Sequence, residues 1–205
     1  MKNIFSELTN ILDKLDEDRE EIIKKSRDIV RDCSIAIKSI HRVDELIYDE
    51  KVIKIKNDLK NLKSLINTNP GHFYKYLKTP EQEYVEAVIL HSIIQKQKMP
   101  GHIDLDIDAL HYVLGLADVI GELRRHVLDN IRMSKREYLN EILDKMDELY
   151  TFLFSLDYPS GMTKDLRHKT DVARNIIERT RGDISLSIQM NKLTILLEES
   201  TKKDK

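Results

Sequence analysis

The first 69 residues contain neither glycine nor proline, and this absence constrains the fold more than any other feature of the chain. Apolar residues in this segment recur at steps of three and four, which is the spacing of one buried stripe along an α-helix. The stripe consists of Ile4, Leu8, Ile11, Leu12, Leu15, Ile22, Ile29, Cys33, Ala36, Ile37 and Ile40. The pattern predicts a very long helix to about Asp44 and a second helix to about Ile66, with a candidate break near residues 48–50.

Turn and cap signals divide the rest of the chain into shorter helices. Thr79, followed by Pro80 and Gln82, has the pattern of a capped helix start. Ser134 and Glu137 have the pattern of a capping box that opens a later helix. The helices expected after residue 70 span about 79–98, 106–133, 134–156, 163–181 and 185–198.

Six or seven helices with short connections predict an all-α antiparallel bundle, and residues 1–205 are expected to form one domain. Gly182 is expected to end the helix that precedes it, and residues 199–205 are expected to fray. At about 1.5 Å per residue, the first helix is longer than a compact domain of this size is wide. We therefore expect the chain to need a partner subunit.

Charge and cysteine content limit the functions open to the chain. Charged residues make up 34% of it, yet the formal net charge is −2, so a surface for nucleic acid must be a local patch. Cys33 is the only cysteine, which excludes an internal disulfide and fits a reducing cytoplasm. No apolar run approaches the roughly 20 residues that span a bilayer, and the acidic N terminus lacks the apolar core of a signal peptide. The sequence predicts a cytoplasmic protein with no membrane contact.

Two acidic pairs stand out by their surroundings, although such pairs are common in a chain with 36 acidic residues. Between Tyr112 and Leu123, every residue is apolar or glycine except Asp118 and Glu122. These two acids are one helical turn apart and share a face. A helix that is apolar nearly all round is a buried helix, and an ionised carboxylate there is costly unless it meets a cation or hydrogen-bond donors.

The second pair is Glu83 and Glu86, which lie among the apolar residues of the segment 84–90. If the two helices face each other, four carboxylates converge, and they cannot all remain ionised without positive charge between them. A hard divalent cation, Mg²⁺ or Mn²⁺, meets that need and can activate water against a phosphodiester. Gly115 and Gly121 in the other apolar segment suggest the close approach of a neighbouring helix.

Other roles for these residues stay open. The acids can be structural, exposed on a helix face or paired with Arg124, Arg125 or another chain. A ferritin-like di-iron site needs a Glu-x-x-His sequence from each of two helices, and the chain contains none. The nearest sequences are Asp108-x-x-His111 and Asp165-x-x-His168. A zinc site lacks a cluster of cysteine and histidine ligands. His91 and His126 lie about a turn beyond the acidic pairs, where they can touch a substrate or simply pack.

At the same two segments, the sequence resembles the translin/TRAX family, and its TRAX (translin-associated factor X) branch more than translin. Residues 82–88 match the TRAX pattern QEYVEAV, and residues 112–123 resemble the TRAX segment DYLLGVADLTGEL. Weaker likenesses occur at Ser26-Arg27-Asp28-Ile29, His41-Arg42 and Arg181-Gly182. The resemblance covers about residues 20–182.

The resemblance implies a fold of seven helices and a hollow, closed shell of eight subunits. In the TRAX branch, acids that match Glu83, Glu86, Asp118 and Glu122 bind Mg²⁺ on the inner surface and catalyse endonucleolytic cleavage of RNA. Translin subunits bind single-stranded RNA or DNA and lack the full set of acids. Because this chain carries all four, it is similar to the catalytic branch.

The chain also departs from the animal members of that branch. The segment 96–106 is short where animal TRAX has a long insertion, and the residues after Gly182 do not resemble the family. These differences suit an archaeal-type homolog that assembles from one kind of subunit.

Nucleic-acid contacts require local basic patches, which gain affinity by releasing counterions from phosphates. By the resemblance, we expect Arg27, His41, Arg42 and Arg125 to bind nucleic acid. The lysines between residues 51 and 63 are expected to form a solvated helix face. The aromatic candidates for base stacking are Tyr84 and Tyr112, although packing in the core is the more common role for such residues.

The sequence therefore predicts an Mg²⁺-dependent (or Mn²⁺-dependent) endoribonuclease that acts on single-stranded or short RNA inside a homo-octameric shell. The alternative is a non-catalytic shell that binds single-stranded RNA or DNA, with structural acids. A third hypothesis is a helical scaffold without a nucleic-acid partner.

Overall fold

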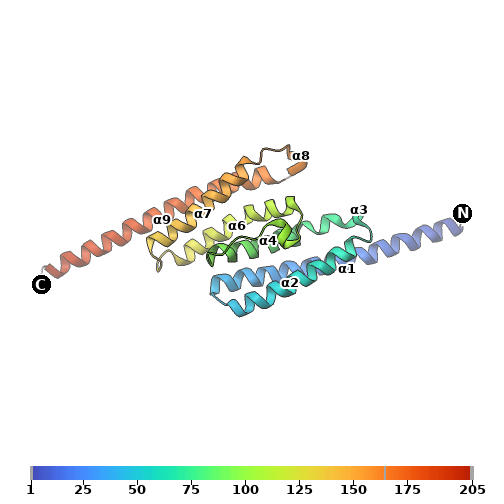
Figure 1. The fold of residues 1–205 in the computed structure, drawn as a ribbon, viewed down its shortest axis with the longest axis horizontal. Helices are drawn as coiled ribbons and strands as arrows, with labels where there is room; N and C mark the ends of the chain where they lie inside the picture. Colours follow the sequence, from blue (N-terminus) through green and yellow to red (C-terminus); the bar gives the residue numbers. More distant parts are fainter. Residues whose placement is uncertain (1, 164, 204–205) are drawn as a thin grey trace. The chain divides into compact units, whose positions relative to one another are not determined.

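The computed structural model describes residues 2–163 and 165–203, and every regular element in these ranges is a helix (Figure 1). The predicted all-α class is confirmed. The contacts divide the chain into two compact units, which are described separately below. The first is Met1–His91 with Pro100–Gly115, and the second is Ser92–Met99 with Leu116–Lys205.

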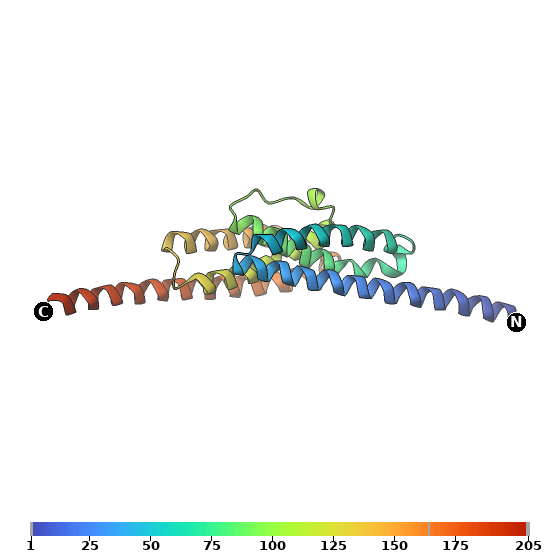
Figure 2. The same ribbon diagram turned by 90° about the horizontal axis from the view of Figure 1, so that it is seen from below.

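The first unit is built on the predicted long helix. Helices α1 (Lys2–Arg42) and α2 (Glu45–Ile66) run antiparallel and lie side by side (Figures 1 and 2). Between them, Val43 has a φ of 58°, and the Asp44 carboxylate accepts a hydrogen bond of 3.2 Å from the backbone N–H of Ile47. This cap begins α2, so the candidate break near residues 48–50 is wrong and Tyr48 is buried inside α2.

The apolar stripe of α1 is buried only along its later part. Ile22, Ile29 and Cys33 are at most 1% exposed and pack in the same core as Ile55 and Leu62 of α2. The earlier members of the stripe, at Ile4, Leu8, Ile11 and Leu12, are exposed by half or more. This part of α1 runs on beyond α2 (Figure 2). The expected partner subunit for this surface stays a prediction.

The chain then turns through α3 (Pro70–Phe73) and η1 (Tyr74–Tyr76) into α4 (Lys78–Ile94). The predicted cap at Thr79 is wrong, because α4 already begins at Lys78 and the N–H of Glu81 donates to the carbonyl of Leu77 at 3.0 Å. Helix α4 ends four residues before the predicted Lys98. A short helix, α5 (His102–Leu105), lies in the following connection and was not predicted.

Helix α6 (Ala109–Asn130) begins in the first unit and continues into the second. Its start is capped by Asp108, whose carboxylate accepts hydrogen bonds from the N–H groups of Leu110 at 2.9 Å and His111 at 3.2 Å. The His111 ring lies 2.7 Å from the buried Glu81 carboxylate. The Asp108-x-x-His111 sequence therefore serves the start of a helix.

The second unit also contains α7 (Arg136–Ser155), α8 (Ser160–Thr163) and α9 (Leu166–Lys203). Helices α7 and α9 run antiparallel side by side, as Figures 1 and 2 show. Lys135 occupies the cap position of α7 and makes no side-chain cap bond, so the predicted capping box at Ser134 is wrong.

Helix α9 continues through Gly182, where a helix end was expected. Residues on both sides of this glycine have partners in the unit: Arg124 bonds to Thr180 at 3.0 Å and pairs with Asp183 at 2.9 Å, and Ile184 is buried. These contacts outweigh the roughly 1 kcal/mol that one glycine costs inside a helix. Of the expected frayed tail, residues 199–203 continue α9, and residues 204–205 lie outside the described residues.

Within residues 2–163 and 165–203, no helix combines the length and the apolar character needed to cross a membrane.

Candidate functional site

The first acidic pair interrupts an otherwise buried helix. From Pro80 to Ile93, every residue of α4 is buried except Glu83 and Glu86, which are both half-buried. Their spacing of three places them on one face of the helix. The acids therefore form the side on which this stretch of α4 meets solvent.

Cys33 of α1 lies within electrostatic range of this pair. Burial raises the pKa of the Cys33 thiol well above its ordinary value, and the negative charges of Glu83, Asp32 and Glu86 raise it further. The carboxylates of Glu83 and Glu86 therefore lie near the C-terminal half of α1, where Cys33 is located. A thiol held neutral in this way takes no part as a nucleophile or thiolate ligand.

The second acidic pair has the same setting on α6. Between Leu114 and Leu123, every residue is buried except Asp118, Gly121 and Glu122. Gly121 and Glu122 lie three and four residues after Asp118, so all three positions lie on one side of the helix. The prediction of a buried helix with one acidic face is confirmed.

Asp118 is neutralised by a lysine that the sequence did not reveal. The Lys169 ammonium of α9 contacts both carboxylate oxygens of Asp118, with Oδ2 at 2.5 Å. The pair is partly open to solvent, since 34% of the Asp118 side chain and 23% of the Lys169 side chain are exposed. Helical spacing within α6 gives no signal for this partner, because Lys169 is 51 residues away in the chain.

The arginines weighed as partners of the second pair have other contacts. Arg124 pairs with Asp183, and Arg125 lies 3.7 Å from Glu122 and 3.9 Å from Asp129. Pairing of Asp118 with Arg124 or Arg125 is therefore wrong, whereas the contact between Glu122 and Arg125 is present.

The two glycines of the segment differ in their surroundings. A Cβ atom added to Gly115 would lie 2.8 Å from the Gln82 carbonyl oxygen and 2.8 Å from Val85 Cβ, so α4 and the start of α6 approach closely there. At Gly121, an added Cβ would meet nothing within 4 Å, so the expected close neighbour is wrong for this position. Gly121 instead lines a groove of about 420 Å³ between α6 and α9, beside the Asp118–Lys169 pair.

The donor chemistry of the four acids suits a hard cation. All four offer carboxylate oxygens, which Mg²⁺ and Mn²⁺ prefer. Among residues 2–163 and 165–203, no group of three or more His, Cys, Asp or Glu side chains lies in an arrangement that could hold a metal ion. Each acidic pair is thus seen as two carboxylates on one helix, and a shared metal site stays a prediction.

The two histidines near the acidic pairs have structural contacts. His91 lies 2.8 Å from the Glu45 carboxylate and stacks on Tyr48, with ring centroids 3.8 Å apart. His126 lies 2.6 Å from the Tyr138 hydroxyl. Both rings are buried, which favours packing over contact with a substrate.

The residues expected to bind nucleic acid are mostly exposed. Arg27 and Arg42 are exposed at positions of α1 that are roughly 20 Å apart along the axis, and His41 is half-buried beside Arg42. The Arg125 side chain is 49% exposed. The aromatic candidate Tyr84 is buried in the core.

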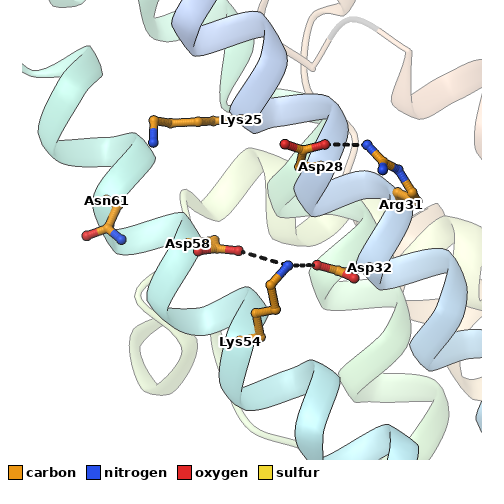
Figure 3. Close-up of a pocket in the computed structure, with 7 residues that line it drawn as sticks. All are labelled: Lys25, Asp28, Arg31, Asp32, Lys54, Asp58 and Asn61. Carbon is orange, nitrogen blue, oxygen red and sulfur yellow. Dashed lines mark hydrogen bonds and ion pairs between the residues drawn. The ribbon is translucent and has the colours of Figure 1, made fainter.

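The lysines between residues 51 and 63 are not a simple solvated face. Lys51 at 2.9 Å and Lys54 both pair with Asp32, a carboxylate of α1 whose side chain is only 8% exposed. Figure 3 shows the contact between Lys54 and Asp32. Burial opposes ionisation of Asp32, but the hydrogen bonds from Lys54 and Lys51 outweigh it and lower the pKa. Lys63 pairs with the buried Glu81 at 3.1 Å. These lysines hold α2 to its neighbours in the first unit.

The family match decides how this arrangement is classified. Residues 17–181 match the Translin family. The chain belongs to the translin family. Both acidic pairs and the Lys169 position lie inside the matched range, whereas the N-terminal turns of α1 and the end of α9 lie outside it.

Two relatives resemble the chain over most of its length. An uncharacterized protein of Methanocaldococcus jannaschii is 43% identical over 188 residues, which cover 91% of this chain and 83% of that protein. The translin-associated protein X homolog of Schizosaccharomyces pombe is 25% identical over 200 residues, or 89% of this chain and 86% of that protein.

Solved structures of the same family share the fold. The crystal structure of AfC3PO has a TM-score of 0.83 at 27% identity, and the match covers 91% of this chain and 97% of that one. A structure of AfC3PO in complex with duplex RNA has a TM-score of 0.82 at 26% identity over 91% and 97% of the two chains. Apo-NeC3PO has a TM-score of 0.81 at 26% identity, with coverages of 89% and 96%.

Proposed function

We propose that this translin-family chain is an Mg²⁺- or Mn²⁺-dependent endoribonuclease that assembles as a homo-octameric shell in the cytoplasm. One observation carries the proposal: on two otherwise buried helix segments, the acids Glu83 and Glu86 and the acids Asp118 and Glu122 form the half-buried faces. A structural protein gains little from such positions, because a half-buried carboxylate loses hydration and requires compensating charge.

Each residue has a stated role in the proposal. Glu83, Glu86, Asp118 and Glu122 would hold the divalent cation, and the bound cation supplies an activated water and neutralises charge that develops on the phosphate. Gly115 supports the pair on α4, because its missing side chain lets α6 approach Gln82 and Val85. Arg27, His41, Arg42 and Arg125 would bind the RNA backbone.

RNA as the substrate class is supported by two relatives. One solved neighbour is a complex of AfC3PO with duplex RNA, and one curated relative is named for translin-associated protein X. We propose single-stranded or short RNA as the substrate, since a closed shell admits flexible or short strands most readily.

A cleavage assay tests the proposal. Purified protein is incubated with fluorescently labelled single-stranded RNA, single-stranded DNA or duplex RNA, with Mg²⁺, Mn²⁺ or a chelator. Asp118→Asn is expected to lower the rate at least about a hundredfold, since it removes one carboxylate charge from the proposed site. Asp144→Asn, the same change at an exposed position of α7, is expected to leave the rate unchanged. Equal cleavage by the wild type and Asp118→Asn would refute the catalytic role.

The assembly is tested by light scattering. A shell of eight subunits has a mass of roughly eight times 24.1 kDa. A monomer in solution would contradict the shell and leave the exposed apolar residues at the start of α1 unexplained.

The second candidate function is a non-catalytic shell that binds single-stranded RNA or DNA. The Asp118–Lys169 pair favours it, because the lysine neutralises one acid of the set without a metal. This reading predicts that wild type and Asp118→Asn both shift labelled RNA in a gel, with strong salt dependence, and that neither cleaves it.

A further inference from the structure

Lys169 contacts Asp118, one of the proposed metal ligands, and the acidic pattern gives no reason for this contact. Its ammonium contacts both oxygens of Asp118 and comes from α9, a helix that carries none of the four acids. An ammonium in this place neutralises the carboxylate that a divalent cation would otherwise bind.

We infer that Lys169 is an exchangeable counter-cation of the proposed metal site: it occupies Asp118 when no divalent cation is bound and competes with that cation. The inference rests on the proposed function, because it requires Asp118 to be a metal ligand. Lys169 is therefore a positioning residue that acts through Asp118 and sets the metal concentration at which the site fills.

Geometry gives the first reason for competition. A carboxylate offers about four lone-pair positions on its two oxygens, and Lys169 contacts both of these oxygens. Mg²⁺ binds carboxylate oxygens at about 2.0–2.1 Å and tolerates little distortion. A cation at that distance and the ammonium in its present position would be only about 4–5 Å apart.

Electrostatics gives the second reason. Even with the dielectric constant of water, one positive charge about 5 Å from a divalent ion weakens its binding by roughly tenfold. Because about two thirds or more of both side chains are buried, screening at this pair is weaker than in bulk water. Roughly tenfold is thus the lower limit of the effect of Lys169 on metal affinity if the ammonium stays nearby.

The surroundings allow the lysine to leave. The groove of about 420 Å³ beside the pair is lined by Lys169, Gly121, Ala117, Val172 and Ala173, among others. Gly121 keeps this space open, since it has no side chain and its position meets nothing within 4 Å. The four-carbon stem of Lys169 can lie along the apolar wall with its ammonium turned to water.

The test measures equilibrium Mn²⁺ binding by the electron paramagnetic resonance signal of the unbound ion, with no RNA present. Lys169→Met removes the charge and keeps an unbranched chain, and it is expected to bind Mn²⁺ at least about tenfold more tightly than the wild type. Lys169→Arg keeps the charge and should bind within about twofold of the wild type. Lys192→Met, at an exposed position of the same helix, is the matched control and should also leave the affinity unchanged.

A second measurement covers the case in which Lys169→Met folds poorly. Lys169→Gln then replaces it, and thermal unfolding is followed with and without saturating Mn²⁺. The neutral variant should gain more thermal stability from Mn²⁺ than the wild type does, because ligand stabilisation grows with affinity. A purely structural role for Lys169 predicts a loss of stability with no larger gain from the metal.

The outcomes separate the inference from the proposed function. If Glu83→Gln and Asp118→Asn weaken Mn²⁺ binding but the neutral Lys169 variants bind no more tightly than the wild type, the counter-cation role is wrong and the metal site stands. If Glu83→Gln and Asp118→Asn bind Mn²⁺ as the wild type does, the metal site itself is wrong, and the role of Lys169 is overturned with it.

Discussion

Replacing Gly115 with alanine tests the close approach of α4 and α6 in the first unit. Inside a helix, alanine is more favourable than glycine by about 1 kcal/mol, so the change would stabilise an open position. At Gly115, the added Cβ would lie 2.8 Å from the Gln82 carbonyl oxygen and 2.8 Å from Val85 Cβ. Both distances are well inside van der Waals contact, and the oxygen belongs to a helical backbone that cannot rotate away.

The magnitude follows from these two opposing effects. Overpacking of a well-packed core costs about 1–3 kcal/mol, and two contacts this short at once place Gly115→Ala in the upper part of that range. After the gain in helix propensity, the variant should lose about 1–2 kcal/mol of unfolding free energy. Gly182→Ala is the matched control, because Gly182 also lies inside a helix but an added Cβ there meets nothing within 4 Å. It should gain up to about 1 kcal/mol.

Guanidinium unfolding followed by circular dichroism measures both variants, at one protein concentration because assembly contributes to apparent stability. The expected result is a shift of opposite sign for the two glycines. If Gly115→Ala is as stable as Gly182→Ala, the two helices are further apart than the structure has them. The support that Gly115 gives to the helix of Glu83 and Glu86 would then have no basis.

Two further predictions concern α1. The pKa of Asp32 is lowered in the folded state, so the stability that this carboxylate contributes is present above the ordinary carboxyl pKa of about 3.9 and is lost as the pH falls through the folded value. In Asp32→Asn, the unfolding free energy measured from pH 7 to pH 3 should therefore depend less on pH than in the wild type. An unchanged pH profile would contradict the pairing of Asp32 with the lysines. Because burial and nearby acids raise the pKa of the Cys33 thiol, the native protein should react with a disulfide reagent at least about 100-fold more slowly than the unfolded chain. Rapid reaction of the native protein would show that the thiol is accessible.

The long helices and the acidic faces could be predicted because their signals are local. The apolar stripe of α1 and the absence of glycine and proline determine a helix whatever surrounds it, and the observed end at Arg42 is close to the predicted Asp44. The segment around Asp118 and Glu122 is apolar nearly all round, so its sequence predicts a buried helix with one acidic face. Both acidic pairs are accordingly found as the half-buried faces of buried segments.

Features that depend on tertiary contacts could not be predicted. Gly182 has the local character of a helix end, but the bonds from Arg124 to Thr180 and Asp183 continue α9 past it. Lys54 and its neighbours on α2 have the spacing of a solvated face, and only the position of Asp32 opposite them shows their role. Lys169 is far from Asp118 in sequence, so no spacing rule connects the two residues.

Asp32 and Asp118 show how exposure separates a fixed ion pair from an exchangeable one. Asp32 is 8% exposed and has two lysine partners, so its removal leaves Lys51, itself mostly buried, without compensation. Removing one partner of a buried ion pair costs about 3–5 kcal/mol, which is the loss expected for Asp32→Asn. Asp118 is 34% exposed and pairs with Lys169, whose flexible stem lies beside an open groove, so Asp118→Asn should cost less than about 1 kcal/mol. The two variants should therefore affect different properties. Asp32→Asn should lower the unfolding free energy and leave the Mn²⁺ affinity unchanged, whereas Asp118→Asn should change the unfolding free energy little and weaken Mn²⁺ binding. If Asp118→Asn instead destabilises the protein as much as Asp32→Asn does, Lys169 holds Asp118 as a structural pair and does not exchange with a metal.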